Sequence, residues 1–286
     1  MFSEQQLSAY CARIGIDRPQ RADADALVAV QAAHRRTIPF ENLSVMLGHA
    51  VSSDGAAVFD KLVTRRRGGF CFEHNRLLDD ALRAMGFTNL LLLARVMLGD
   101  PAALPPKTHC LLLVAIDGKP WVADAGFGGA YAPPMRLADG GTAQSDDGAR
   151  HRLSILPEGD PAGAWLLERL GAEGGTDGRG GADGEWRKQF AFDLAETVDA
   201  DMAMGCHWAA THPSSRFVNH HVVSRCLPDG FASMVDRRMT LWRAGEEADE
   251  REIASAREYR EVLEEVFALP LSQEEVERLP LWRKPH

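Results

Sequence analysis

The chain carries the segment Arg67-Gly68-Gly69-Phe70-Cys71-Phe72-Glu73-His74-Asn75, in which one cysteine follows two glycines. Apolar residues then recur at helical spacing and stop at Gly86, so we predict a helix over 71–85 with Cys71 in its first turn. A thiol at that position meets unpaired N–H groups and the positive end of the helix dipole, which favours the thiolate. Cys71 is therefore a candidate nucleophile. The alternative is a small buried apolar residue, a common role for free cysteine.

A histidine and an aspartate lie on a predicted hairpin further along the chain. Residues 109–116 form an apolar run, Asp117-Gly118 is a strong turn signal that Lys119-Pro120 extends, and 121–125 has the pattern of the returning strand. A turn of even length centred on Asp117-Gly118 places His109 and Asp124 on one face of the sheet. As diagonal neighbours they would then be about 7–8 Å apart.

These residues suit a catalytic triad. Cys71 would attack, His109 would take its proton, and Asp124 would orient the imidazole and support its positive charge. Taken singly, His109 also fits a core histidine bonded to the backbone, and Asp124 also fits a turn residue before glycines. Their occurrence in one chain, on elements able to converge, favours nucleophilic acyl chemistry.

Five segments occur in this order along the chain: Ile38–Leu43, Arg67–Asn75, Thr108-His109, Asp124–Gly128 and Thr211–Phe217. Through these segments the sequence resembles the arylamine N-acetyltransferase family from its N-terminus to at least Thr240. By that resemblance Cys71 accepts the acyl group, His109 is the base and Asp124 orients it. The family also implies a helical domain, a β-barrel and an α/β lid around a core like that of cysteine proteases and transglutaminases.

The resemblance implies an acetyl-coenzyme A-dependent transfer to arylamines, arylhydroxylamines or hydrazines through an acetyl-cysteine thioester, with ping-pong kinetics. Coenzyme A would contact Thr108, the loop containing Phe127 and Gly128, and Ser214 within the segment 211–217. The Ser214 and Ser215 hydroxyls can hydrogen-bond pantetheine or phosphate, and Arg216 can meet a phosphate, although a Pro-Ser turn is the alternative for the serines.

Two aromatic residues and one charged pair complete the expected site. Phe40 and Phe127 are candidates for binding the aromatic face of the acceptor, and core packing is the alternative for both. The Cys71 N–H is a candidate oxyanion donor. The resemblance also suggests that Glu41 and Arg67 pair beneath the site and hold the cysteine loop.

Composition agrees with a globular enzyme. The chain has 286 residues, 45% hydrophobic and 26% charged, and a net charge of −9, which argues against a broad nucleic-acid surface. The five cysteines lack C-x-x-C spacing and indicate reduced thiols in a cytoplasm. No signal peptide and no apolar window of about 18 residues is evident, so we expect no membrane partner. The expected oligomeric state is a monomer or a homodimer.

The predicted fold class is α+β, with a helical domain over 1–86, a β-barrel domain over 87–200 and an α/β lid over 201–286. In the first part, helices are expected from Ser3, over 23–36 and over 71–85. Loops are expected at 139–149 and, rich in glycine, at 171–184. Strands are expected at 90–98, 109–116, 120–125, 151–156, 164–170, 185–192, 217–226 and 231–243, and a helix at 249–267.

Other functions fit some of these features. The spacing of Cys71, His109 and Asp124 is compatible with a transglutaminase-like cysteine hydrolase, and an amide synthase fed by a carrier protein would use the same acyl chemistry. A binding module with a buried cysteine would make the triad accidental. The cluster of His207, His212, His220, His221 and Cys206 matches no zinc pattern, so we expect no metal.

Overall fold

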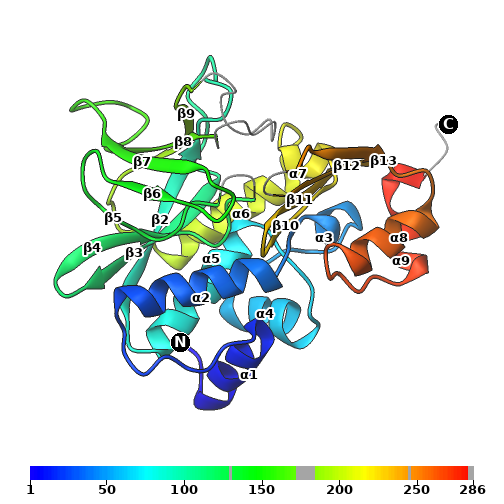
Figure 1. Cartoon of the computed structure of the whole chain (residues 1–286), viewed down its shortest axis with the longest axis horizontal. Coiled ribbons are helices and arrows are strands. Elements are labelled where there is room, and N and C mark those ends of the chain that lie inside the picture. Colours follow the sequence, from blue (N-terminus) through cyan, green and yellow to red (C-terminus); the bar gives the residue numbers. More distant parts are fainter. Residues whose placement is uncertain (129–130, 172–183, 244–245, 283–286) are drawn as a thin grey trace.

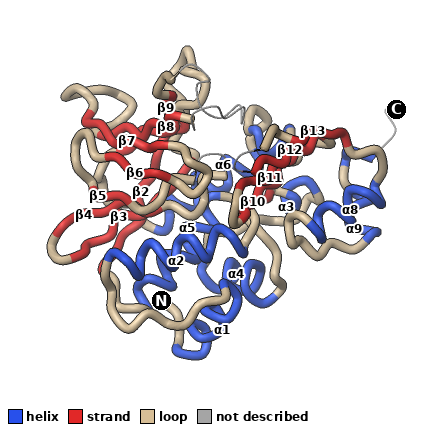
Figure 2. The backbone as a smooth tube through the Cα atoms, in the orientation of Figure 1, coloured by secondary structure: helices blue, strands red, loops and turns tan. Residues whose placement is uncertain are grey.

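The computed structural model of the chain describes residues 1–128, 131–171, 184–243 and 246–282. Within these residues it combines N-terminal helices, a nearly closed eight-stranded antiparallel barrel, and a five-stranded C-terminal sheet flanked by short helices (Figures 1 and 2). This architecture confirms the predicted fold class. The domain boundaries at residues 86 and 200 stay a prediction.

The N-terminal helices begin where the sequence places their caps. The Ser3 hydroxyl accepts the Gln6 N–H and opens α1, and the Asp23 carboxylate accepts the Ala26 N–H and opens α2. The helix that carries the cysteine begins at Cys71 as predicted, because the Glu73 carboxylate accepts the Phe70 N–H at 3.1 Å. The helical elements of this part are α1 (Glu4–Ile14), α2 (Ala24–Thr37), α3 (Leu43–Met46), α4 (Gly55–Phe59), a π-helical turn (Asp60–Thr64) and α5 (Cys71–Ala84).

The barrel strands follow in the order β5-β4-β3-β2-β9-β8-β7-β6 across the sheet. All neighbouring strands in this sheet run antiparallel. The strands are β2 (Thr88–Val96), β3 (His109–Ile116), β4 (Lys119–Ala123), β5 (Met135–Arg136), β6 (Thr142–Gln144), β7 (Arg150–Ile155), β8 (Trp165–Leu170) and β9 (Arg187–Phe192).

The β3–β4 hairpin has the predicted register. Asp117 and Gly118 have φ angles of 50° and 71°, as a two-residue hairpin turn of the primed type requires, and Leu112 lies opposite Ala123. The extension of the turn to Lys119-Pro120 was wrong, because both residues already pair with β3. The turn therefore has the even length on which the placement of His109 and Asp124 depends.

Two predicted loops have different outcomes. The prediction of a loop at 139–149 was wrong for 142–144, which form β6 and pair with β7. An edge strand needs only backbone partners on one side, so its polar Thr142 and Gln144 give no apolar pattern. In the predicted glycine-rich loop, residues 172–183 lie outside the described residues.

The C-terminal sheet has the order β1-β10-β11-β12-β13, so the short strand after α2 pairs with a strand from the last third of the chain. The strands are β1 (Phe40–Glu41), β10 (Val222–Leu227), β11 (Gly230–Val235), β12 (Arg238–Arg243) and β13 (Asp249–Glu252). The helices of this part are α6 (Asp199–Thr211), α7 (Arg216–Asn219), α8 (Ala256–Glu265) and α9 (Gln273–Arg278), with a 3-10 turn at Pro280–Trp282.

Three predicted boundaries in this part were wrong. Residues 217–219, predicted as the start of a strand, belong to helix α7, because the Ser215 hydroxyl caps the turn by accepting the Phe217 N–H. The run 231–243 is two strands, β11 and β12, which pair across a short turn. Residues 249–252 pair with β12 as β13, and the helix begins only at Ala256, after the Ser255 cap.

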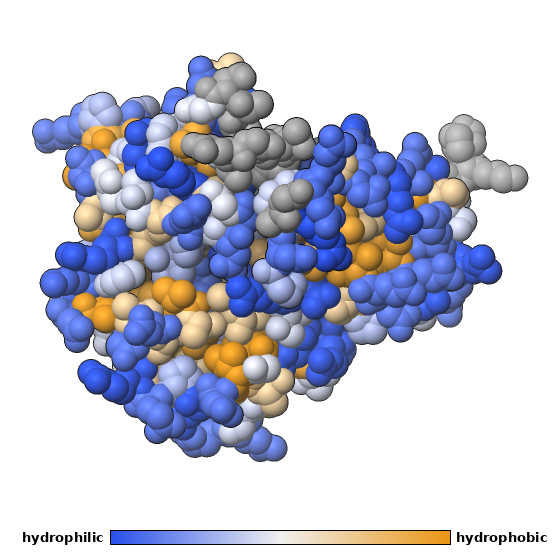
Figure 3. Space-filling view, viewed as in Figure 1, coloured by the Kyte–Doolittle hydropathy of each residue, from blue (hydrophilic) through white to orange (hydrophobic). Residues whose placement is uncertain are grey.

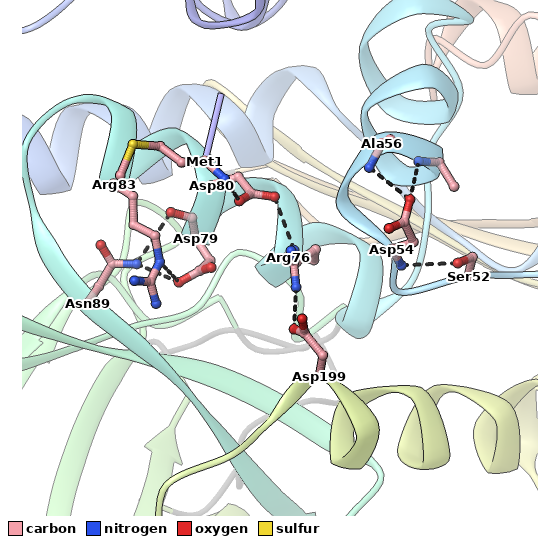
Figure 4. A network of polar contacts seen from close by, with 11 residues as sticks. Met1, Ser52, Asp54, Ala56, Arg76, Asp79, Asp80, Arg83, Asn89 and Asp199 are labelled. Atoms are coloured by element: carbon pink, nitrogen blue, oxygen red, sulfur yellow. Dashed lines mark hydrogen bonds and ion pairs between the residues drawn. The ribbon is translucent and has the colours of Figure 1, made fainter. Parts of the chain in front are cut away.

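Helix α6 is fixed against α5 by charge. The Arg76 guanidinium on α5 binds the Asp80 carboxylate at 3.1 Å and the Asp199 carboxylate, at the start of α6, at 2.7 Å (Figure 4). Phe72 from α5 and Met202 from α6 also belong to one buried hydrophobic core. These contacts hold α6 beside the first turn of α5, where it forms one wall of the site.

The outer surface carries both hydrophilic and apolar residues. On the face shown in Figure 3 it is mostly hydrophilic, with apolar patches, one of them over the C-terminal sheet. Among the described residues, no helix combines the length and the apolar character needed to span a membrane.

Candidate active site

Cys71 is the first residue of α5 and its side chain is buried, with 3% exposure. Its Sγ lies 3.5 Å from the Thr108 carbonyl oxygen. Burial raises the pKa of the thiol, but hydrogen bonds with Cys110 and His109 and the charge of His109 outweigh burial and lower the pKa to about 6. The lowered pKa favours the thiolate form of Cys71.

His109 opens β3, and its Nε2 lies 2.7 Å from Oδ2 of Asp124, which directly follows β4. Burial lowers the pKa of the imidazole, but the Asp124 charge and hydrogen bond raise it to about 10. The rings of Phe127 and Phe190 pack on the imidazole at centroid distances of 4.9 and 4.8 Å. The imidazole is thus held by a carboxylate and two aromatic rings, and the carboxylate favours its protonated form.

The Asp124 carboxylate is satisfied on both oxygens. Its Oδ1 accepts the Asn75 side-chain amide at 2.9 Å and the Gly126 N–H at 2.7 Å. The backbone N–H of Asp124 donates to Oε1 of Gln31 at 2.8 Å. Burial raises the pKa of this carboxyl, but the charge of His109 and these hydrogen bonds hold it below its usual value. Asp124 therefore stays ionised and fixed in orientation.

A cavity of about 380 Å³ opens over the sulfur. Its walls come from the segment after β2, the loop after β4 and the turn between α6 and α7. Most of the predicted site residues line it, whereas Asp124 stands behind His109 and does not. The predicted residues in its wall are Phe40, Cys71, Thr108, His109, Phe127, Gly128 and Ser214.

The segment 211–217 contributes two serines with different roles. The Ser214 hydroxyl lies at the cavity and 2.8 Å from Nδ1 of His212. The Ser215 hydroxyl is buried, donates to the Ala209 carbonyl at 2.6 Å and caps α7. Ser215 is thus engaged in the fold, and the exposed side chain of Arg216 is the cation at this wall of the cavity.

Glu41 and Arg67 pair below the site, as the resemblance suggested. Arg67 Nη2 lies 3.6 Å from Glu41 Oε1, and Arg67 Nη1 lies 3.4 Å from a Glu275 carboxylate oxygen on α9. Glu41 is fully buried, with the charges of Lys61 and Arg67 keeping its pKa below the usual value against the effect of burial. The pair joins the loop before Cys71 to β1 and to the C-terminal helices.

The clustered histidines have other partners. His220 Nδ1 lies 2.9 Å from the Asp236 carboxylate, and the His221 backbone N–H donates to the same group at 2.9 Å. His212 is stacked on the Trp208 ring. In the part of the chain that the structure describes, no group of three or more His, Cys, Asp or Glu side chains is arranged to hold a metal ion.

Sequence reasoning gave no role to several residues that the structure brings to the site. Asn75 lies one helical turn after Cys71, so its i, i+4 spacing was a usable signal. Gln31 on α2 and Phe190 on β9 carry no local signal, because each meets the hairpin only through tertiary packing.

Several known proteins are similar to this chain in sequence or in structure. A family model described as N-acetyltransferase matches residues 23–276. An arylamine N-acetyltransferase of Escherichia coli is 36% identical over 265 residues, which are 92% of this chain and 88% of the relative. The structure of a Salmonella typhimurium arylamine N-acetyltransferase has a TM-score of 0.87 at 31% identity, covering 98% of both chains. A Mycobacterium marinum arylamine N-acetyltransferase in complex with CoA has a TM-score of 0.84 at 27% identity, covering 96% of this chain and 98% of that one.

Proposed function

The chain belongs to the arylamine N-acetyltransferase family, and on that premise we propose that it moves an acetyl group from acetyl-coenzyme A to an arylamine, arylhydroxylamine or hydrazine through a thioester on Cys71. The observation that carries the proposal is that Cys71 and His109 line the same 380 Å³ cavity, with the Asp124 carboxylate 2.7 Å behind the imidazole. A thiolate paired with an imidazolium is ready to attack a thioester carbonyl.

In the first half-reaction the Cys71 sulfur bonds to the acetyl carbonyl carbon, and the bond from that carbon to the coenzyme A sulfur breaks. One thioester replaces another, so the step is nearly neutral in free energy. The Cys71 N–H, at a helix start without an intrahelical acceptor, is the proposed donor to the oxyanion. The departing thiol takes its proton from His109.

In the second half-reaction the amine nitrogen bonds to the acetyl carbon and the bond to Cys71 Sγ breaks. His109, now neutral, accepts the proton that the nitrogen loses, and the thiolate–imidazolium pair is restored. Asp124 supports the imidazolium and fixes the nitrogen that faces the sulfur. Because the two substrates react in turn, this route predicts ping-pong kinetics.

The cavity wall suggests where each substrate binds. We place the pantetheine arm of coenzyme A along Thr108, Phe127, Gly128 and Ser214, with Arg216 toward a phosphate. The acceptor ring would lie against Phe40 and Phe127, which are both buried and both line the cavity.

Acetyl-coenzyme A mixed with the protein, followed by intact-mass measurement, tests the covalent step. We expect one acetyl group on Cys71, released when an arylamine or hydrazine is added, and parallel lines in double-reciprocal plots. Cys71→Ala should form no adduct, whereas Cys11→Ala, which removes a buried thiol on α1, should behave like the parent.

A folded protein that forms no adduct would overturn the transferase proposal. Hydrolysis of glutamine or peptide amides without coenzyme A would point to a hydrolase, and an adduct formed only from a carrier-protein thioester would point to an amide synthase. Formation of the adduct in Cys71→Ala would place the nucleophile elsewhere.

A further inference from the structure

Two histidines outside the triad lie in the core of the helical layer. His34 on α2 and His74 on α5 have no exposed surface, and His34 Nε2 lies 2.9 Å from His74 Nδ1. At one end of the pair, His34 Nδ1 lies 2.9 Å from the hydroxyl oxygen of Tyr10, a fully buried residue of α1. At the other end, His74 Nε2 lies 3.1 Å from the Pro39 carbonyl oxygen. This histidine network, formed by Tyr10, His34, His74 and the Pro39 carbonyl, crosses the packed helices α1, α2 and α5 and ends on the backbone before β1 (Figure 1).

The partners of the two imidazoles fix where each proton sits. The Pro39 carbonyl oxygen can only accept, so His74 Nε2 carries a proton. In neutral His74 the Nδ1 atom is then an acceptor, and His34 Nε2 donates to it. By the same rule His34 Nδ1 accepts, and the Tyr10 O–H donates to it. Every link therefore pairs a donor with an acceptor, and all donations run from α1 toward Pro39.

A proton added to the pair would reverse part of this order. If His74 carried protons on both nitrogens, His34 would have to accept at Nε2 and donate from Nδ1. The Tyr10 O–H would then have no acceptor among the described residues, although it is fully buried. The geometry thus favours two neutral imidazoles in one fixed tautomer.

The surroundings of the pair also favour the neutral forms. Burial is the main cause that lowers the pKa of His34 well below its usual value, and it lowers the pKa of His74 to about 4. Burial raises the pKa of the Tyr10 hydroxyl, which therefore keeps its proton. The charged groups that act on the two histidines are Arg13 of α1, Arg35 of α2, Lys61 of the π-helical turn and Glu41 of β1.

The network ends beside Phe40, which lines the cavity. Phe40 directly follows Pro39, and its ring lies nearly parallel to the His74 imidazole, with 10° between the planes and 6.2 Å between the centroids. The Phe217 ring lies 5.7 Å from the Phe40 ring, and a Cβ on Gly128 would lie 2.6 Å from it. His74 therefore meets Phe40 twice, through the carbonyl that precedes it and through the ring.

We propose that His34 and His74 are positioning residues, which with Tyr10 form a one-directional series of hydrogen bonds that fixes the Pro39 carbonyl and so sets Phe40 for the ring of an aromatic acceptor. The inference rests on the proposed function, in which Phe40 binds that ring. It predicts that the network controls how well an aromatic acceptor reacts relative to an acceptor without a ring.

NMR of the folded protein with ¹⁵N-labelled histidine tests the network directly. At about pH 7 we expect both imidazoles to be neutral, with a proton on Nε2 and none on Nδ1. Tyr10→Phe should shift the Nδ1 signal of His34. Tyr259→Phe is the matched control, because it removes a fully buried hydroxyl from α8 in another hydrophobic core, and it should leave both histidines unchanged. A charged imidazole, or a proton on Nδ1 of either histidine, would overturn the network.

Steady-state kinetics with acetyl-coenzyme A test the positioning role, with an arylamine and an aliphatic hydrazide compared as acceptors. In His74→Leu, kcat/KM for the arylamine should fall by about three- to tenfold more than kcat/KM for the hydrazide, because the Phe40 ring loses its support. His74→Gln keeps a donor and an acceptor at the end of its side chain and should restore the parental preference. Tyr259→Phe should keep that preference as well.

An equal loss for both acceptors in His74→Leu would make the histidines packing residues, and so would a glutamine variant that matches the leucine variant. If His74→Leu does not fold, Tyr10→Phe replaces it, since it removes one donor and keeps the ring. An unchanged preference in that variant would separate the network from Phe40.

Failure of the parent to take an acetyl group from acetyl-coenzyme A would count against the proposed function alone. The tautomers are measured without any substrate, and titration with the arylamine, followed by NMR, then measures binding of the ring. His74→Leu should bind the arylamine about three- to tenfold more weakly than the parent, and equal affinities would overturn the positioning role.

Discussion

Asn75 donates a hydrogen bond from its side-chain amide to Oδ1 of Asp124 at 2.9 Å, although 49 positions separate the two residues. The same side chain accepts the Ala125 N–H at 3.0 Å through its Oδ1. The helix that carries the nucleophile is thereby tied directly to the end of the hairpin that carries the base and its carboxylate. This one amide fixes how the two halves of the site face each other.

Replacing Asn75 with alanine should therefore reduce both stability and turnover. The buried Asp124 oxygen and the Ala125 N–H each lose a partner, which costs about 1–3 kcal/mol, and the carboxylate keeps only its bonds to His109 and to the Gly126 N–H. We expect a lower melting temperature and a fall in kcat/KM. Asn89→Ala is a matched control. The Asn89 amide donates to the Asp79 carboxylate at a distance of 2.7 Å, and neither residue lines the cavity (Figure 4). It should lower the melting temperature alone, and equal kinetic losses in the two variants would contradict the assigned role of Asn75.

Asp124→Asn should reduce kcat/KM by about 10³- to 10⁴-fold while the fold persists. The amide cannot stabilise the imidazolium, so the pKa of His109 falls and the thiolate loses its partner. Steady-state kinetics with acetyl-coenzyme A and an arylamine measure the loss. Asp236→Asn changes a second aspartate that lies 2.9 Å from a histidine, His220, outside the cavity. It should be close to neutral, and a similar loss there would point to a general effect of aspartate removal.

The acylation rate should depend on pH through the protonation states of Cys71 and His109. The pKa of Cys71 is depressed to about 6, so the thiolate is lost as the pH falls through that value. The pKa of His109 is raised to about 10, so the imidazolium is lost only as the pH rises through that value. The rate of single-turnover acylation should therefore rise as the pH increases through about 6 and then stay level. It should fall as the pH increases through about 10, where His109 loses the proton that the departing thiol needs. A single rise at about pH 8.5, the ordinary value for a free thiol, would contradict the ion pair.

Arg67→Ala should cost stability more than chemistry. It removes one of the two cations whose charges offset the burial of Glu41 and leaves Lys61, so the loss should be below the cost of about 3–5 kcal/mol for a buried charge with no partner. Thermal unfolding should show a drop of several degrees. Arg18→Ala removes an ion pair whose partners are 47% and 80% exposed and should change the melting temperature little. If Arg67→Ala melts like the parent and loses only turnover, the pair is not structural.

Gly126→Ala should damage the site directly. A Cβ at this position would lie 2.7 Å from Cys71 Cα and 2.8 Å from the Cys71 carbonyl oxygen, so the loop or the nucleophile has to move. A displacement of about 1 Å at a reacting group costs on the order of 100-fold in rate. Gly140→Ala meets nothing within 4 Å but has a φ of +69°, so it should lose about 1 kcal/mol of stability and no activity. Unchanged kinetics in Gly126→Ala would mean that the loop adapts.

Local signals carried much of the fold. Ser3 and Asp23 predicted two helix starts, apolar spacing that ends at Gly86 predicted the helix over 71–85, and Asp117-Gly118 predicted the turn on which the hairpin register depends. The predictions failed where backbone pairing outweighed side-chain pattern. Residues 249–252 joined the edge of a sheet although their sequence continues into a helical stripe, and β6 formed from polar residues for the same reason.

By itself, the sequence determined that Cys71 begins a helix and that His109 and Asp124 share a face, because caps, periodicity and a two-residue turn act over a few residues. Tertiary structure alone decided that α5 and the hairpin meet, that Asn75 binds Asp124, that the Cys110 thiol lies against Cys71, and that the turn from α6 to α7 closes the cavity. These contacts join residues far apart in the chain, and they form only when the helical layer and the barrel bury a common core.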